Sequence, residues 1–206
     1  GEFKGFQMGA LVNYAKKMRG IQFGLVNVTD TLKGIAFGLI NVSKNGYMRV
    51  EIQGSDLLHT SVRFKSGTRS FYTVFQGGVR WKPLGSAYGG GFGLGSRIDL
   101  TKRFFSEFEI DNVYVREHNG NGPFLGILVR TTPSIGIRIV GPLEFHVGPT
   151  LTYHYANSRF SANGNISSEL GLSPFYRSVS TSQLHQIWVG VKGGIQFDLN
   201  WKKPKK

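Results

Sequence analysis

Hydrophobic and polar residues alternate along most of this chain with the two-residue period of a β-strand. In residues 143–155, LEFHVGPTLTYHY, the apolar positions Leu143, Phe145 and Val147 alternate with polar residues or glycine, and residues 187–199, IWVGVKGGIQFDL, repeat the pattern. Both runs are longer than the usual strand of a soluble protein, which has about 5–6 residues. Because the helical period is nearly absent, the sequence predicts an all-β fold.

The alternation and the turn-forming residues between its runs predict about ten strands, within a range of 8–12. Residues 47–65 and 123–140 are each expected to form one long strand, although either could break, at Asp56 or Pro133. The expected strands lie at residues 3–14, 19–28, 33–43, 47–65, 69–82, 86–99, 103–117, 123–140, 143–155 and 184–201.

The expected connections differ in length between the two ends of the strands. The turns after residues 28, 65, 99 and 140 are short and share one end, whereas the loops 117–123 and 156–183 lie at the other end. Several aromatic residues also fall near strand ends. Short turns on one side, long loops on the other and an even strand count are typical of a closed antiparallel transmembrane β-barrel. A soluble sandwich would scatter its loop lengths.

A short apolar sequence is repeated near the start of the chain. Residues 5–13, 20–27 and 34–41 each follow a pattern close to Gly-x-Gln-x-Gly-x-x-Asn, at spacings of about 14–15 residues. The favoured interpretation is that these copies are strands of the barrel wall. The alternative is a short β-solenoid, with one coil per copy and a ladder formed by Asn13, Asn27 and Asn41. We expect one outer-membrane domain over residues 1–206, with a repeat segment at 1–46 and a barrel core at 47–206.

The charge distribution fits a barrel whose interior is filled by paired side chains. The chain has a formal net charge of +13, yet the face opposite the apolar one carries as many acidic as basic residues. A narrow interior requires this balance, because buried charges must be paired. The expected interior network comprises Arg49, Glu51, Arg63, Arg80, Arg97, Asp99, Glu107, Glu109, Asp111, Arg130, Arg138, Glu144, Lys192 and Asp198. The excess positive charge falls near the rims, where lipid phosphates lie, and nothing resembles a nucleic-acid-stacking surface.

Composition restricts the chemistry further. The chain has no cysteine, which excludes disulfides and thiolate metal sites. It has no apolar run long enough for a transmembrane helix. No signal peptide is visible, so we interpret the sequence as a mature form. We expect no cofactor and no metal.

Two stretches carry a resemblance to known proteins. Lys192, Gly194, Phe197 and Leu199 match the C-terminal assembly signal of bacterial outer-membrane proteins, although the basic tail after Trp201 departs from it. The opening copies resemble the G-x-Q-x-G-x-x-N repeats of bacterial surface-repeat proteins. They are similar to Bacteroidetes outer-membrane β-barrel proteins in which such repeats lead into a barrel, as are the stretches KNGYMRVEI, RFKSGTRSFYTVF and AYGGGFGLGSRIDLTKRF. The resemblance covers most of residues 5–155. The resemblance implies location in a Gram-negative outer membrane. The implied partners are outer-membrane lipids, lipopolysaccharide phosphates and the barrel-assembly machinery.

The sequence favours a structural or accessory role over catalysis. We expect a plugged barrel rather than a wide pore, and no enzyme. One alternative is a subunit of a larger outer-membrane transport or secretion complex. The other is a small lipid-modifying barrel enzyme, for which His154 and Ser158 are the local candidates. A metal site formed by Glu144, His146 and His154 is disfavoured, because this spacing does not by itself complete a coordination sphere.

Overall fold

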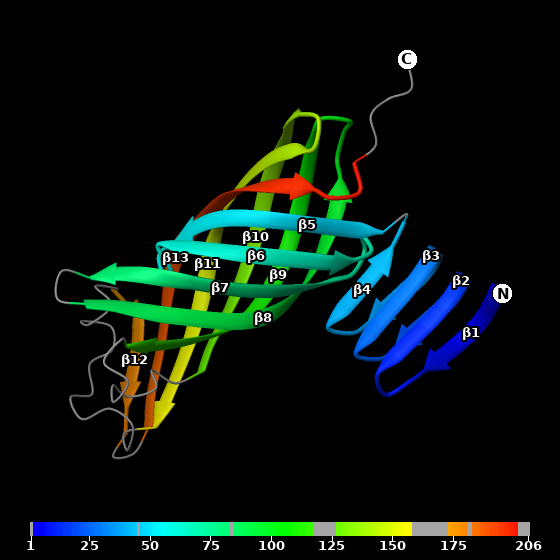
Figure 1. Ribbon diagram of the computed structural model, residues 1–206. Coiled ribbons are helices and arrows are strands. Elements are labelled where there is room, and N and C mark those ends of the chain that lie inside the picture. Colours follow the sequence, from blue (N-terminus) through cyan, green and yellow to red (C-terminus); the bar gives the residue numbers. More distant parts are fainter. Residues whose placement is uncertain are drawn as a thin grey trace.

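The computed structural model describes residues 2–44, 46–82, 85–117, 127–157, 173–180 and 183–201, which form two β-sheets (Figure 1). The secondary-structure elements of these residues are β-strands, so the prediction of an all-β fold is confirmed. The described part of the chain contains no helix long and apolar enough to cross a membrane.

The repeats form a separate four-stranded parallel sheet, which we call the repeat sheet. Its strands are β1 (Glu2–Met8), β2 (Val12–Phe23), β3 (Val26–Phe37) and β4 (Ile40–Ser43), in that order. The pairing keeps equivalent repeat positions in line, so that Gly5, Gly20 and Gly34 form one row. This is an open β-solenoid. The favoured interpretation, in which the copies are barrel-wall strands, is therefore wrong, as are the strand limits expected within residues 3–43.

The repeat sheet is stabilised by a ladder of amide side chains and by a small apolar interior. Asn13 Nδ2 donates to Asn27 Oδ1 at 2.9 Å, and Asn27 Nδ2 donates to Asn41 Oδ1 at 2.8 Å. These amides are nearly fully buried, next to a cluster of Ala15, Met18, Leu32 and Ala36. The ladder explains why each apolar repeat contains an asparagine. The side-chain amide of each coil stacks on the equivalent amide of the next coil and forms a hydrogen bond with it, so these buried polar groups are satisfied.

The second sheet is antiparallel throughout its described strands, and its pairings return to their starting point. The strands β5 to β11 each pair with the next, and β13 pairs with both β11 and β5. The short β12 lies beside the start of β13. We call β5–β11 and β13 the strand ring. Its strands are β5 (Tyr47–Ser55), β6 (Thr60–Gly67), β7 (Tyr72–Lys82), β8 (Gly85–Asp99), β9 (Phe104–Glu117), β10 (Ile127–Val140), β11 (Leu143–Asn157) and β13 (Gln183–Asp198), and β12 is Tyr176–Val179.

Three differences from the expected strands have local causes. Residues 47–65 do not form one strand, because the chain turns at Asp56–His59 and begins β6 at Thr60. Pro133 does not break β10: the strand continues through it, opposite Phe108 of β9. β12 lies in a segment that was expected to be a loop. The connections at 68–71, 100–103 and 141–142 are short and share one end of the ring, as expected.

Alternation in the strand ring separates a buried face from an exposed one. In β10, for example, Leu128, Arg130 and Thr132 are buried whereas Ile135 is 62% exposed. The buried face is largely polar and charged, and the exposed face is largely apolar. This arrangement reverses the usual distribution of a soluble protein.

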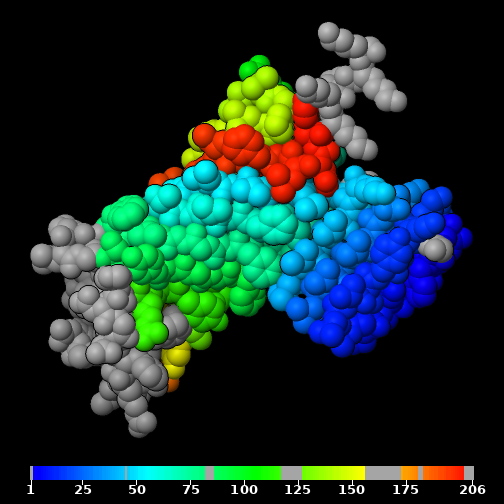
Figure 2. All heavy atoms as spheres, viewed as in Figure 1, coloured from blue at the N-terminus to red at the C-terminus, as the bar shows by residue number. Residues whose placement is uncertain are grey.

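The repeat sheet packs against the short-turn end of the ring, where it forms a distinct lobe in Figure 2. The Asn41 backbone N–H donates to Ser66 Oγ at 3.2 Å, and the Phe37 ring lies 4.5 Å from that of Phe71. Asn200, after β13, donates through Nδ2 to the carbonyl oxygens of Ser43 and Gly46. Asn41, the last residue of the asparagine ladder, is therefore in direct contact with the strand ring.

Candidate functional site

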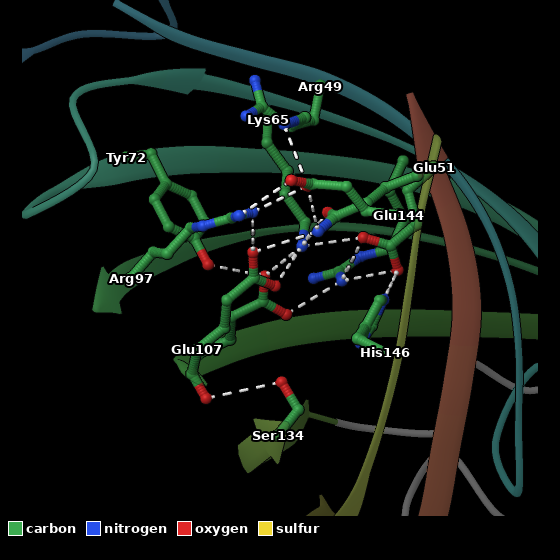
Figure 3. Close-up of polar contacts among 12 residues, drawn as sticks. Arg49, Glu51, Lys65, Tyr72, Arg97, Glu107, Ser134, Glu144 and His146 are labelled. Atoms are coloured by element: carbon green, nitrogen blue, oxygen red, sulfur yellow. Dashed lines mark hydrogen bonds and ion pairs between the residues drawn. The ribbon is translucent and has the colours of Figure 1, made fainter. Parts of the chain in front are cut away.

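The interior of the strand ring contains a buried network of charged side chains, which we call the charge cluster (Figure 3). At its centre the Arg63 guanidinium lies 2.8 Å from Glu109, 2.9 Å from Asp111 and 3.2 Å from Glu51. Lys192 Nζ lies 2.6 Å from Glu109. All these side chains are almost inaccessible to solvent, so each charge is neutralised by protein groups rather than by water.

The cluster extends toward the short-turn end through a second group of ion pairs. Arg97 contacts Glu144 at 2.7 Å and Glu107 at 3.4 Å, while its guanidinium also lies over the Phe105 ring at 3.6 Å. Arg49 contacts Glu144 at 3.3 Å. Guanidinium groups suit such sites because their fixed fork of donors can serve two carboxylates at once.

The expected interior residues do not all belong to this cluster. Arg130 joins it through Asp111 at 3.2 Å. Arg138, Asp99 and Asp198 lie at the short-turn rim and are partly exposed, with Arg138 contacting Asp99 and Glu144. Arg80 is separate: its Nη1 donates to the carbonyl oxygens of Asp56 and Leu57 in the turn before β6.

Four residues of the cluster were not expected from the sequence. Lys65 lies within 2.9 Å of Glu51, Glu107 and Glu109, yet the sequence indicated it only as the last residue of an expected strand. Its position, two residues after Arg63 on the same strand, was the signal that could have identified it. Gln196 donates to Glu107 and Glu144, and Tyr47 and Tyr72 donate through their hydroxyls to Glu107 and Glu109.

The turn between β5 and β6 folds into the interior beyond the charge cluster, and we call residues 56–59 the inner turn. Leu57 and Leu58 are buried in an apolar group with Val113, Val115, Leu128, Leu184, Ala87 and Trp188. The Asp56 carboxylate accepts hydrogen bonds from Trp188 Nε1 at 2.9 Å and Thr150 Oγ1 at 3.2 Å. The interior therefore contains the charge cluster in one half and, in the other, this apolar group together with the hydrogen-bonded Asp56 carboxylate.

The opposite face of the ring carries exposed apolar side chains along its strands. Aromatic residues on this face gather toward the end that bears the longer connections, at Trp81, Tyr88, Tyr114 and Tyr153. Large exposed aliphatic and phenylalanine side chains fill the height between the rims: Ile52, Val62, Phe92, Leu94, Phe108, Ile110, Ile135, Val147, Leu151, Val189, Val191 and Ile195.

The expected assembly-signal residues lie on both faces of the last strand and just beyond it. Lys192 points into the charge cluster, and a methyl group at Gly194 would approach Gln53 Cβ to 2.7 Å. Phe197 is 43% exposed on the apolar face, and Leu199 follows the end of β13. The alternation of this stretch is thus as expected.

The residues considered for catalysis or metal binding are used in other contacts. His146 Nε2 lies 3.0 Å from Glu51 Oε1, and His154 Nδ1 lies 3.3 Å from Gln186 Oε1. Ser158 lies outside the described residues. Within those residues, no group of three or more His, Asp or Glu side chains is arranged to hold a metal ion.

Two titratable groups outside the ring strands have pKa values shifted from their ordinary values. The Asp30 carboxylate, 2.8 Å away, raises the pKa of Lys44 between the repeat sheet and the ring. Partial burial, together with the charge of Arg80, lowers the pKa of His59 in the inner turn. Neither group is part of the charge cluster.

No protein-family model matches the chain, and a search of curated proteins finds no match.

Proposed function

We propose that this protein is a structural or accessory component of a Gram-negative outer membrane. In this proposal the strand ring is a closed β-barrel that spans the bilayer, and the repeat sheet is carried at one end of it. The barrel is plugged rather than open, and the protein acts as a scaffold without catalysis.

The main support for the proposal is the distribution of side chains in the strand ring, where charged residues are buried inside and apolar residues are exposed outside. Charged groups such as Arg63, Glu109 and Asp111 are fully buried, while Ile135, Val189 and Val191 are each more than half exposed on the outside. In water this arrangement would leave a large apolar surface uncovered. In a bilayer the same surface faces hydrocarbon, and the pairing cycle leaves no open strand edge there.

The filled interior supports the plugged form. An eight-stranded barrel encloses a space just wide enough for side chains to fill. Here the charge cluster fills one half, and Leu57 and Leu58 of the inner turn fill the other. A selective pore would instead present one sign of charge along an open path.

The lengths of the connections support an orientation. In outer-membrane barrels the short turns face the periplasm and the longer loops face outward. The turns at 68–71, 100–103 and 141–142 have two to four residues, and the repeat sheet packs at that end. The two longest connections of the ring, after Glu117 and after Asn157, lie at the other end. The proposal therefore places the repeat sheet in the periplasm.

The test uses two lysine substitutions at different heights on the apolar face. Val191 lies in the middle of β13 and is 56% exposed, whereas Val140 ends β10 at the rim and is 70% exposed. A lysine at mid-bilayer costs about 2–4 kcal/mol and one near the interface about 0–1 kcal/mol. We expect Val191→Lys to reduce accumulation of the folded protein in outer-membrane fractions strongly, and Val140→Lys to leave it almost unchanged.

The unmodified protein should also remain in the membrane pellet after alkaline extraction. A soluble protein would tolerate both lysines, because each side chain would then lie in water. Equal accumulation of the two variants, with release of the protein at alkaline pH, would rule out the membrane-spanning barrel.

A further inference from the structure

The apolar side chains of the repeat sheet gather along one of the two bends of its coils. This bend is formed by the equivalent stretches 23–26 and 37–40, which read FGLV and FGLI and contain no charged residue. Together with residues 8–10, the phenylalanines, glycines and leucines of these stretches line an open groove of about 420 Å³. We call this bend the apolar corner.

The exposure of the apolar corner does not depend on where the repeat sheet begins or ends. Leu25 lies in a middle coil, because its carbonyl oxygen accepts from the Ile40 N–H on one side. On the other side the next residue, Val26, donates through its N–H to the Leu11 carbonyl oxygen. Leu25 is nevertheless 46% exposed. Its side chain therefore points sideways out of the stack, where a further coil would not cover it.

The charged residues of the repeat sheet lie at the opposite bend, which we call the charged corner. In the parallel register Arg19 is in line with Lys33, and Lys17 is six residues before Phe23. Six residues of strand span about 20 Å, so the two corners are well separated. The charged residues of the segment 2–44 are Glu2, Lys4, Lys16, Lys17, Arg19, Asp30, Lys33 and Lys44. Each coil is therefore amphipathic, with one apolar and one charged corner.

The repeat sheet is attached to the outer face of the strand ring. Tyr72 points into the charge cluster, so Thr73, the next residue of β7, points outward. The Thr73 hydroxyl donates to the Leu39 carbonyl oxygen at 3.4 Å, and Ser66 beside it accepts from the repeat sheet. Because Thr73 lies beyond the turn at 68–71, the apolar corner extends past the rim of the ring and along its outer wall.

The apolar corner also continues the apolar exterior of the ring. The Phe71 ring lies 4.5 Å from the Phe37 ring, which lies 6.2 Å from the Phe23 ring. Phe71 is four residues before Phe75, on the same side of the chain, and Phe75 pairs with Phe92, which is 54% exposed. A row of phenylalanine side chains therefore runs from the outer wall onto the apolar corner.

We propose that the apolar corner inserts into the membrane leaflet beside the strand ring, so that the repeat sheet lies along the bilayer surface and its charged corner faces water. The inference rests on the proposed function, because it extends the lipid-facing surface of the ring. An apolar side in lipid and a charged side in water are the arrangement of interfacial elements. Figure 1 shows β4 next to the ring and β1 farthest from it, so each coil adds its own apolar bend to the contact.

The test attaches a fluorophore to single introduced cysteines of the full-length protein, which is reconstituted in phospholipid vesicles without other proteins. Some of the lipids carry a nitroxide quencher on their acyl chains. Leu25→Cys reports on the apolar corner, and Lys33→Cys, at the charged corner of the same sheet, is the matched control. Val191→Cys, on the outer face of β13, reports on the barrel itself. We expect the lipid quencher to act several-fold more strongly on the probes at Leu25 and Val191 than on the probe at Lys33. Iodide in the water should show the reverse preference.

The three probes distinguish two kinds of failure. If the Val191 probe is not quenched by lipid, the ring does not face the bilayer, and the membrane barrel and the inserted corner both fail. If the Val191 probe is quenched by lipid but the Leu25 probe is quenched by iodide, the barrel stands and the inserted corner alone is overturned. Protection of the Leu25 probe from both quenchers would show that a second copy of the chain covers the corner, which would also overturn insertion.

Discussion

At the scale of single residues, the central cations of the interior each contact several carboxylates. The Arg63 guanidinium contacts the carboxylates of Glu51, Glu109 and Asp111, and Lys65 contacts two of the same carboxylates. Removing two charges from water costs more than their attraction returns unless the remaining donors are also satisfied. Consequently, the loss of one central cation affects several anions at once.

We predict that Arg63→Met strongly destabilises the protein. The substitution removes one cationic partner from three carboxylates in a site that water does not reach. Breaking a buried pair in this way costs about 3–5 kcal/mol. The measurement is the free energy of unfolding in urea, in detergent or lipid, and the control is Arg19→Met. Because Arg19 and Glu2 form an exposed pair, the control should change stability by about 0–1 kcal/mol. Similar losses for both variants would contradict the buried cluster.

At the scale of elements, the same alternating pattern serves two different architectures. The repeat strands pair in parallel with equivalent residues in line, whereas the ring strands pair antiparallel. The repeat sheet has its own amide ladder and its own small apolar interior. Damage to one sheet should therefore remain largely confined to it.

We predict that Asn27→Leu loosens the repeat sheet and spares the ring. Asn27 Nδ2 donates to Asn41 Oδ1, to the Phe37 carbonyl and to the Gly24 carbonyl, and Asn27 Oδ1 accepts from Asn13. Each buried partner left unsatisfied costs about 1–3 kcal/mol. Hydrogen exchange should become faster in β2–β4 while β9–β11 keep their protection. Lys33→Leu, at an exposed position of β3, is the matched control. Faster exchange throughout the molecule would show that the two sheets are one cooperative unit.

The sequence predicts the faces of strands well and their partners poorly. Alternation alone placed Arg63, Glu109 and Lys192 on one side of their strands, and the structure brings them together. The same alternation cannot distinguish parallel from antiparallel pairing, because both keep the period of two. It therefore gave the repeats the wrong partners.

The inner turn was missed for a related reason. Residues 47–65 keep their parity across Asp56–His59, so the turn is invisible to the pattern. Leu57 and Leu58 are buried by contacts with β8, β9, β10 and β13, which are distant in sequence. Such contacts depend on tertiary packing, which periodicity does not report.

At the scale of the whole molecule, the repeat sheet and the short turns lie at one end and the longer connections at the other. Under the proposed function, a bilayer separates these two ends. The chain contains no cysteine. Single introduced cysteines can therefore report on which side of a membrane each end lies.

We predict that Ser178→Cys and Lys44→Cys react differently with a membrane-impermeant maleimide on intact cells. Ser178 is an exposed residue of β12, the short strand beside the start of β13 at the end opposite the repeat sheet. Lys44, whose side chain is 75% exposed, lies between the repeat sheet and the ring. We expect Ser178→Cys to be labelled on intact cells, and Lys44→Cys to be labelled only after the outer membrane is permeabilised. Detergent-solubilised protein provides the control, because both cysteines should then react at similar rates. Labelling of Lys44→Cys alone on intact cells would reverse the orientation and place the repeat sheet on the cell surface.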